Sequence, residues 1–206
     1  MTLEITIKSN DRIIGAGQTG SGKTHAAIEM LADAQRLVVI DSKPNHKLMQ
    51  EMNLVRADKK EWRKLTRGKL ARIHVTPPIA TPANLFNYFE RLFHRLYVTA
   101  DLMIYIDEAT AVVQSPTVFP TYLQAIYQRG RELGIGVWSS TQRPVFIPNF
   151  MMTESSKFFC FSLLMQEDRD KMAGMMGQEV RDPIEDRHGF WYYDQPERAL
   201  EYVPEL

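Results

Sequence analysis

A glycine-rich stretch near the amino terminus constrains the fold of this chain more than any other feature. It consists of Gly17-Gln18-Thr19-Gly20-Ser21-Gly22-Lys23-Thr24 and matches the phosphate-binding pattern of Gly, four variable residues, Gly, Lys and Ser or Thr. In this pattern the glycines let backbone N–H groups curl around phosphate oxygens, the lysine reaches the terminal phosphates, and the hydroxyl ligates Mg²⁺. We therefore expect residues 17–24 to bind ATP, with Thr24 as a metal ligand.

The sequence on either side of this loop supports the same interpretation. The apolar pair Ile13-Ile14 precedes it as a strand would, and a helical pattern opens at Lys23. A helix that begins there points its partial positive charge at the phosphates. A glycine-rich turn with no ligand would not need this strand-loop-helix context.

The hydrophobic pattern predicts an α/β protein, because short β-branched runs alternate with longer helical patterns. The expected strands are Arg12–Gly15, Leu37–Asp41, Ala71–Val75, Leu102–Asp107, Ile135–Ser139 and Lys157–Ser162. The expected helices are Gly22–Ala34, Lys59–Thr66, Pro82–Thr99, Phe119–Leu133 and Gln166–Met176. A terminal β-hairpin is expected from Gly189–Tyr193 and Ala199–Val203. We expect a mostly parallel central sheet with helices on both faces.

Composition narrows the class of protein. The 25 basic and 25 acidic residues cancel, which excludes coating of nucleic acid by overall charge and leaves a local basic surface open. The single Cys160 lies in an apolar run and is expected in the core of a protein from a reducing compartment. No apolar run approaches the roughly 18 residues of a membrane span. No linker divides the chain, so residues 1–206 are expected to form one domain.

A second acidic motif indicates what happens to the bound nucleotide. The apolar run Leu102–Ile106 ends in Asp107-Glu108, which matches the second nucleotide-binding motif of P-loop ATPases. Asp107 is expected to hold Mg²⁺ through water. Glu108 is expected to accept a proton from the attacking water, which hydrolysis requires and transfer to a substrate hydroxyl does not. The alternative is that both carboxylates cap the following segment.

A polar residue is expected beside this pair. The strand Ile135–Ser139 runs on into Ser140-Thr141-Gln142-Arg143-Pro144, which places Gln142 at the carboxyl edge of the sheet. There its amide could orient the attacking water or sense the terminal phosphate. A glutamine on its own is a weak signal.

Together these elements resemble the FtsK/HerA superfamily of hexameric DNA-pumping ATPases, whose fold is RecA-like. The stretch Gln128–Pro144 is similar to the family's basic helix end, hydrophobic strand and closing Thr-Gln-Arg-Pro, and the resemblance covers roughly residues 13–162. It implies that Glu108 is the catalytic base and Gln142 the phosphate sensor. It also implies that Arg129 or Arg131 enters the neighbouring subunit's site, whereas composition alone favours solvated helix residues at both positions.

The chain carries no recognisable amino-terminal barrel, membrane anchor or carboxyl-terminal DNA-reading domain, and we expect the motor alone. Such a motor resembles the genome-packaging ATPases of internal-membrane viruses and their plasmid-like kin. The resemblance implies a homo-hexamer or other ring, non-sequence-specific contact with double-stranded DNA, and a capsid or membrane vertex protein as a partner. The location would be cytoplasmic, in the host cell or with the virion. The segment after Glu108 and residues Lys43, His46 and Lys47 are candidate DNA contacts.

Two other functions stay open. A nucleotide or small-metabolite kinase would have a typical length, but we find no arginine-rich lid, and Glu108 and Gln142 have no obvious role in one. Release of phosphate without a phosphorylated acceptor would separate the two enzymes. An ATP-binding switch or scaffold would show slow hydrolysis that neither DNA nor ring formation changes. The acidic segment Asp168-Arg169-Asp170 is expected to be a solvated helix face.

Overall fold

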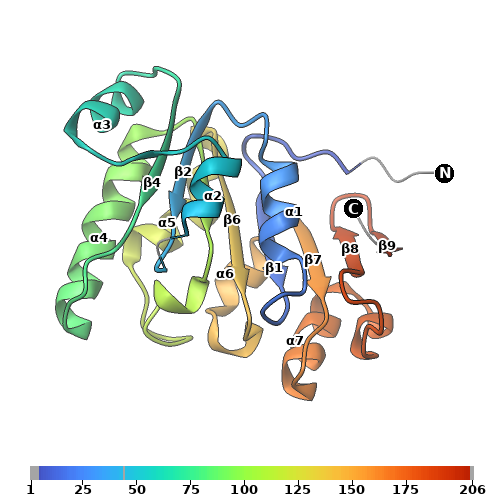
Figure 1. Cartoon of the computed structure of the whole chain (residues 1–206). Helices are drawn as coiled ribbons and strands as arrows, with labels where there is room; N and C mark the ends of the chain where they lie inside the picture. Colours follow the sequence, from blue (N-terminus) through green and yellow to red (C-terminus); the bar gives the residue numbers. More distant parts are fainter. Residues whose placement is uncertain (1–4, 44, 205–206) are drawn as a thin grey trace.

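The computed structural model describes residues 5–43 and 45–204. Its strands are β1 (Arg12–Ala16), β2 (Arg36–Ile40), β3 (Val55–Arg56), β4 (Ala71–Val75), β5 (Leu102–Ile106), β6 (Ile135–Thr141), β7 (Lys157–Phe161), β8 (Phe190–Asp194) and β9 (Ala199–Val203). They form one nine-stranded sheet in the order β3-β4-β2-β5-β6-β1-β7-β8-β9 (Figure 1). Strands β1 to β7 pair in parallel, and the terminal hairpin β8–β9 continues the sheet in antiparallel pairing.

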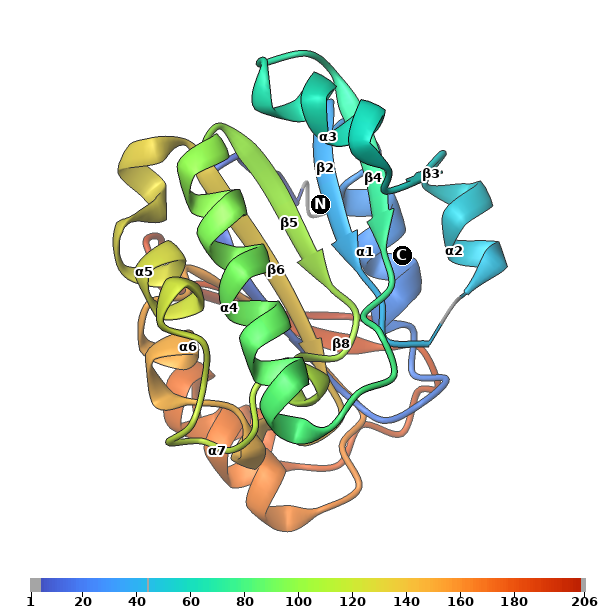
Figure 2. The ribbon, with the colours of Figure 1, turned by 90° about the vertical axis from the view of Figure 1, so that its left-hand side faces the viewer.

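Helices cover both faces of this sheet, as predicted. They are α1 (Lys23–Met30), α2 (His46–Glu51), α3 (Lys59–Thr66), α4 (Pro82–Thr99), α5 (Thr121–Arg129), α6 (Asn149–Thr153) and α7 (Gln166–Met176). Short 3₁₀ turns are η1 (Ala109–Ala111), η2 (Gly130–Leu133), η3 (Pro144–Phe146) and η4 (Gln178–Arg181). Helices α3 to α7 share one hydrophobic cluster with the sheet, while α1 and α2 share a second cluster on the other face. Figure 2 looks onto the face that α4 covers.

The longer elements form where local signals agree. Helix α4 has Pro82 in its first turn, where a missing N–H costs nothing, and it buries Phe89, Leu92, Phe93 and Leu96 as one stripe. Helix α3 begins after Asp58, whose side chain accepts a hydrogen bond from the amide of Glu61. The predicted bounds of α3, α4, α7, β4 and β9 agree with the structure, and those of the other predicted strands differ by one or two residues.

One strand and two helices were missed by the sequence prediction, and two helices were predicted too long. Strand β3 has two residues, α6 has five and α2 has six, too few for a periodic pattern to stand out. The predicted helix over residues 22–34 ends at Met30, because the chain then turns to enter β2. The helix predicted over residues 119–133 is α5 over Thr121–Arg129, and residues 130–133 form the turn η2.

The strand order decides where the functional motifs meet. Strand β6 pairs with both β1 and β5, which therefore lie two places apart in the sheet. The register joins Ala16 to Thr141 and Ile106 to Ser139, so all three strands end at the same edge. The loop after β1, the acidic pair after β5 and the polar residues after β6 consequently emerge side by side.

A mostly buried ion pair reinforces the pairing of the terminal hairpin with the parallel part of the sheet. Lys157, at the start of β7, forms an ion pair with Asp194 and donates a hydrogen bond of 3.1 Å to the hydroxyl of Tyr192.

Cys160, on the same strand, is buried as predicted, and burial raises the pKa of its thiol to about 12. Over the described ranges, no helix combines the length and apolar character that a membrane crossing requires.

Gly136 provides a test of the central packing. A Cβ atom there would lie 2.4 Å from the carbonyl oxygen of Ser9 and 2.7 Å from Cε of Met103. Gly136→Ala should therefore lower the free energy of unfolding by about 1 to 3 kcal/mol, since the segment that crosses β6 must shift. Urea denaturation measures the change.

The matched control is Gly174→Ala in α7, where nothing lies within 4 Å of the added atom. There alanine should stabilise the helix by up to about 1 kcal/mol. Equal stability of Gly136→Ala and the unaltered protein would contradict the packing described for β6.

Candidate nucleotide-binding site

The glycine-rich loop connects β1 to α1 and is anchored to both neighbours of β1. The amide of Gly17 donates to the carbonyl of Thr141 (3.0 Å), and that of Gln18 donates to the carbonyl of Ser162 (2.9 Å). A Cβ on Gly17 would lie 2.6 Å from Cβ of Phe161, and Gly22 has φ +104° directly before the helix. Both positions therefore require glycine.

The loop presents a set of hydrogen-bond donors toward one side. Within the described ranges, the amides of Thr19, Gly20 and Gly22 donate to no protein acceptor, and the buried hydroxyl of Ser21 has no partner. The first amides of α1 are also open, as at any helix start. Unpaired donors gathered at a helix N-terminus fit the phosphate chain of a nucleotide.

Lys23 lies across this loop. Its Nζ donates to the carbonyl of Gly17 at 2.6 Å and to that of Gln18 at 2.8 Å, which holds the ammonium over the turn. Burial lowers the pKa of Lys23, and the carboxylates of Glu108 and Asp107 act in the opposite direction. The cation is thus placed at the loop by the fold, close to both acidic residues.

A hydroxyl and a carboxylate meet where the metal is predicted. Thr24 Oγ1 donates to Asp107 Oδ1 at 3.3 Å, and the Tyr105 hydroxyl donates to the same oxygen at 2.7 Å. Burial raises the pKa of Asp107, while the hydrogen bond from Tyr105 opposes that rise. These hard oxygen donors fit Mg²⁺, which prefers carboxylate, hydroxyl and water ligands. Tyr105 was not predicted as part of the site, because it resembles any buried strand residue.

Glu108 forms the cap that the sequence offers as an alternative, and its carboxylate also lines the pocket. Its Oε1 accepts from Thr110 Oγ1 at 2.8 Å and from the Thr110 amide at 3.3 Å, so it caps η1. The capping alternative is thus correct for Glu108 and wrong for Asp107, which bonds to Thr24 and Tyr105 instead. The cap holds the Glu108 carboxylate in place at the pocket.

Gln142 contacts the phosphate loop directly. Its Oε1 accepts a hydrogen bond of 3.0 Å from Thr19 Oγ1. The contact joins the end of β6 to the tip of the loop after β1. Gln142 therefore lies within hydrogen-bond reach of the loop that is predicted to bind the phosphates.

These residues line one pocket of about 410 Å³, a volume suited to a nucleotide. The predicted residues in its wall are Thr19, Gly20, Gly22, Lys23, Thr24, Asp107, Glu108 and Gln142. Four others were not predicted for it: His25, Ser42, Lys43 and His188. Lys43, a candidate DNA contact, lies in the wall of this pocket, because β2 ends beside β5. Lys47, another candidate, forms an exposed ion pair with Glu51.

Arg129 and Arg131 lie at the other edge of the sheet. Both are exposed, and they precede β6 at its amino end. The seven residues of β6 span about 20 Å, and the pocket lies beyond the far end. Neither arginine reaches the pocket of its own chain.

The prediction of a solvated face at residues 168–170 is wrong for two of its three members. Asp168 is 1% exposed and accepts from Arg143 Nε at 2.7 Å and from the amide of Val145 at 3.1 Å. Arg169 donates to the carbonyl of Leu163 at 2.8 Å. The guanidinium of Arg143, 25 residues away in the sequence, compensates the negative charge of Asp168 and so permits its burial.

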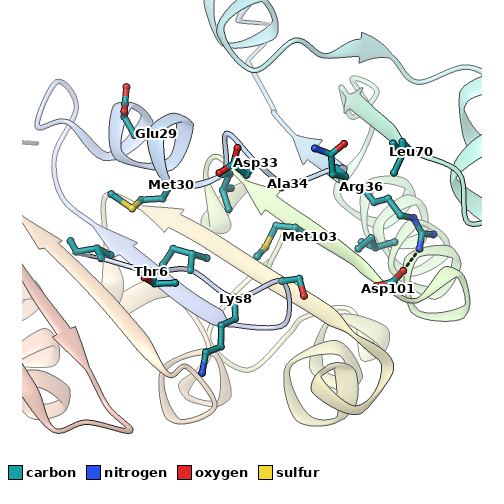
Figure 3. A pocket seen from close by; sticks show the side chains of 16 residues that line it. Thr6, Lys8, Glu29, Met30, Asp33, Ala34, Arg36, Leu70, Asp101 and Met103 are labelled. Atoms are coloured by element: carbon teal, nitrogen blue, oxygen red, sulfur yellow. Dashed lines mark hydrogen bonds and ion pairs between the residues drawn. The ribbon is translucent and has the colours of Figure 1, made fainter. Parts of the chain in front are cut away.

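A larger pocket of about 700 Å³ lies at the amino edge of the sheet, away from this site (Figure 3). Met30 and Met103 line it, together with the ion pair of Arg36 and Asp101. The predicted nucleotide-binding residues do not contribute to its wall. Chemistry rather than size therefore identifies the candidate site.

Strand order, phosphate loop and acidic pair together define a RecA-like P-loop NTPase. Over 169 residues the chain is 27% identical to the DNA packaging ATPase P9 of Enterobacteria phage PRD1, covering 80% of this chain and 70% of that protein. No protein-family model matches the chain. The resemblance to genome-packaging ATPases that the sequence predicts is confirmed by this relative.

Solved structures show the same fold. The genome packaging NTPase B204 of Sulfolobus turreted icosahedral virus 2, in complex with AMPPCP, superposes with a TM-score of 0.76 at 14% identity, covering 97% of this chain and 100% of that one. VirB4 of Thermoanaerobacter pseudethanolicus gives a TM-score of 0.66 at 7% identity, covering 94% and 89%. At these identities the likeness establishes the RecA-like fold, terminal hairpin included.

Proposed function

We propose that this protein is a Mg²⁺-dependent ATPase that drives double-stranded DNA into a viral capsid as a ring of identical subunits. The observation that carries the proposal is that Lys23, Asp107, Glu108 and Gln142 line one pocket although they come from three separate parts of the chain. The similarity to the packaging ATPase P9 supports DNA as the substrate that is moved. Residues 1–206 form one motor domain in this proposal.

The proposed chemistry assigns a role to each group in the pocket. The open amides of the loop and the ammonium of Lys23 bind the phosphates of ATP. Thr24 and Asp107 would hold Mg²⁺, which supplies positive charge to the phosphates during transfer. Glu108 accepts the proton of the attacking water, and the cap formed with Thr110 keeps its carboxylate oriented.

Gln142 would report the state of the terminal phosphate. Its hydrogen bond to Thr19 joins it to the loop that binds the phosphates. Gln142 also follows β6, the strand that α5 and η2 precede. A shift at Gln142 can therefore be passed along β6 toward the edge that carries Arg129 and Arg131.

Either Arg129 or Arg131 would complete the site of the next subunit. Both are exposed and far from their own pocket, as a residue that acts in a neighbouring molecule must be. A guanidinium supplied in this way adds charge to the transferring phosphoryl group only when subunits are docked. Hydrolysis would then depend on assembly of the ring.

ATPase activity measured across protein concentration, with and without long double-stranded DNA, tests the proposal. We expect the rate per subunit to rise steeply with concentration and to be stimulated by DNA. Phosphate should appear without any phosphorylated acceptor, which separates hydrolysis from a kinase reaction. A slow rate that neither DNA nor concentration changes would contradict the motor and favour a nucleotide-dependent switch.

Two substitutions separate nucleotide binding from hydrolysis. Lys23→Ala should lose nucleotide binding, because the loop loses its only side-chain cation. Glu108→Gln should retain ATP and lower kcat on the order of 10² to 10⁴-fold, since an amide accepts the Thr110 hydrogen bonds but not a proton. Fluorescent-nucleotide binding and phosphate release measure the two effects.

The matched control is Glu201→Gln, which makes the same change on the exposed face of the terminal hairpin. Its binding and turnover should equal those of the unaltered protein. Normal turnover by Glu108→Gln would remove Glu108 from the role of base.

Mixing subunits tests the arginines. Arg129→Ala and Arg131→Ala are each assayed alone and after mixing with Glu108→Gln, which retains both arginines. For the residue that acts in the neighbouring site, the mixture should hydrolyse ATP faster than the sum of its separate components. If neither mixture exceeds that sum, neither arginine acts across the interface.

A further inference from the structure

A second polar pocket, of about 560 Å³, lies between α4 and the β3–β4 edge of the sheet. We call it the arginine pocket. Its main side chains are Arg56, Arg91, Arg95, Trp62, Tyr88 and His74. It shares no lining residue with the nucleotide pocket.

The charged side chains that line the arginine pocket are arginines, so they are all positive. No carboxylate is among the described residues that line it, and Arg56, Arg91 and Arg95 form no ion pair there or elsewhere in the described ranges. In a chain with zero net charge, such a cluster is a local separation of charge rather than a general excess. A ligand with negative charge would neutralise it.

The arrangement of the arginines suits phosphate groups. Tyr88, Arg91 and Arg95 lie at intervals of three and four along α4, so they share one helix face. Arg56, on β3, lines the same pocket from the opposite wall. Guanidinium groups bind phosphate oxygens through paired N–H donors, and spaced cations match the repeated charges of a nucleic acid backbone.

An aromatic ring positions one of these arginines. The guanidinium carbon of Arg95 lies 4.0 Å from the centroid of the Trp62 ring, within the range of a cation–π contact. Trp62 is 8% exposed and packs in the core, so it provides a rigid support for Arg95. Among the described residues, Arg56 and Arg91 have no aromatic ring in such contact, and both are exposed, so each can turn toward a ligand.

One buried pair connects the two pockets. His74 Nε2 lies 3.2 Å from Asp41 Oδ2, and both residues are almost fully buried. Asp41 in turn accepts a hydrogen bond of 2.8 Å from the amide of Lys43, which lines the nucleotide pocket. A ligand that shifts β4 at His74 would therefore also shift Asp41 and, through it, the backbone of Lys43 in the wall of the nucleotide pocket.

We propose that the arginine pocket binds phosphate groups of the DNA backbone and couples DNA binding to ATP hydrolysis through His74 and Asp41. The inference rests on the proposed function, in which DNA is the substrate moved. It adds a contact site that neither the sequence motifs nor the nucleotide pocket indicates. Contacts of this kind are independent of base sequence, as packaging of a whole genome requires.

The experiment compares the unaltered protein with Arg56→Gln/Arg91→Gln, using fluorescence anisotropy with a labelled DNA duplex over a range of salt concentrations. Both arginines are exposed, and among the described residues neither side chain has a hydrogen bond or ion pair, so the fold should be retained, and thermal unfolding verifies it. The Kd should rise on the order of tenfold at low salt. The plot of the logarithm of the association constant against the logarithm of the salt concentration has a negative slope. That slope should become less steep by about 2, because each lost phosphate contact reduces its magnitude by about 0.9. The ratio of ATPase rates with and without DNA should also fall.

The control variant is Arg67→Gln/Arg198→Gln, which removes two exposed arginines outside the pocket. It should keep the Kd, the salt slope and the stimulation ratio of the unaltered protein. Equal losses in both variants would show a general charge effect and overturn the assignment of the pocket.

Other outcomes also decide the matter. If the unaltered protein binds DNA and the Arg56→Gln/Arg91→Gln variant binds it equally well, the inference is wrong and the proposed motor stands. If that variant instead loses only the binding of inorganic phosphate, measured by calorimetry, the pocket is a site for free phosphate. If the unaltered protein neither binds DNA nor responds to it, the proposed function fails together with the inference.

Discussion

The parallel pairing of β6 between β1 and β5 is the constraint on which the rest of the structure depends. Its backbone hydrogen bonds set the register that brings three strand ends to one edge. The strand is buried along its whole length, and its Gly136 lets the amino-terminal segment cross at close range. Without β6 in that place, Gln142 could not reach Thr19, and the acidic pair would lie against the wrong neighbour.

The fold also separates charges that cancel in the composition. Asp107 and Glu108 gather with Lys23 and Lys43 at the carboxyl edge, where burial raises the pKa of Asp107 and the hydrogen bond from Tyr105 opposes that rise. Arginines gather in a pocket beside α4, with no carboxylate among the described residues that line it. Two more, Arg129 and Arg131, are exposed at the amino edge. In the proposed motor, a neutral chain would thus present distinct surfaces to a nucleotide, to the DNA backbone and to a neighbouring subunit.

Local patterns predicted the elements that are long and strongly periodic. Helices α3 and α4 begin with a side-chain cap and bury an apolar stripe, and α7 ends at Gly177, so short stretches of consecutive residues mark their limits. The two-residue strand β3 and the six-residue helix α2 carry too little pattern, because neither completes enough of its own period to stand out in the sequence. The prediction that Asp168 is solvated was wrong for a related reason, since Arg143, which compensates its charge, is distant in the sequence.

The sequence by itself determined the phosphate loop, the acidic pair and the α/β class, because each depends on residues that are consecutive or regularly spaced. Only the tertiary structure decided that Glu108 and not Asp107 caps η1, that Ser42, Lys43 and His188 line the nucleotide pocket, and that Arg56 and α4 line a common pocket. These contacts join segments that are far apart in the chain. Their geometry follows from strand order and packing, which the linear pattern of residues does not specify.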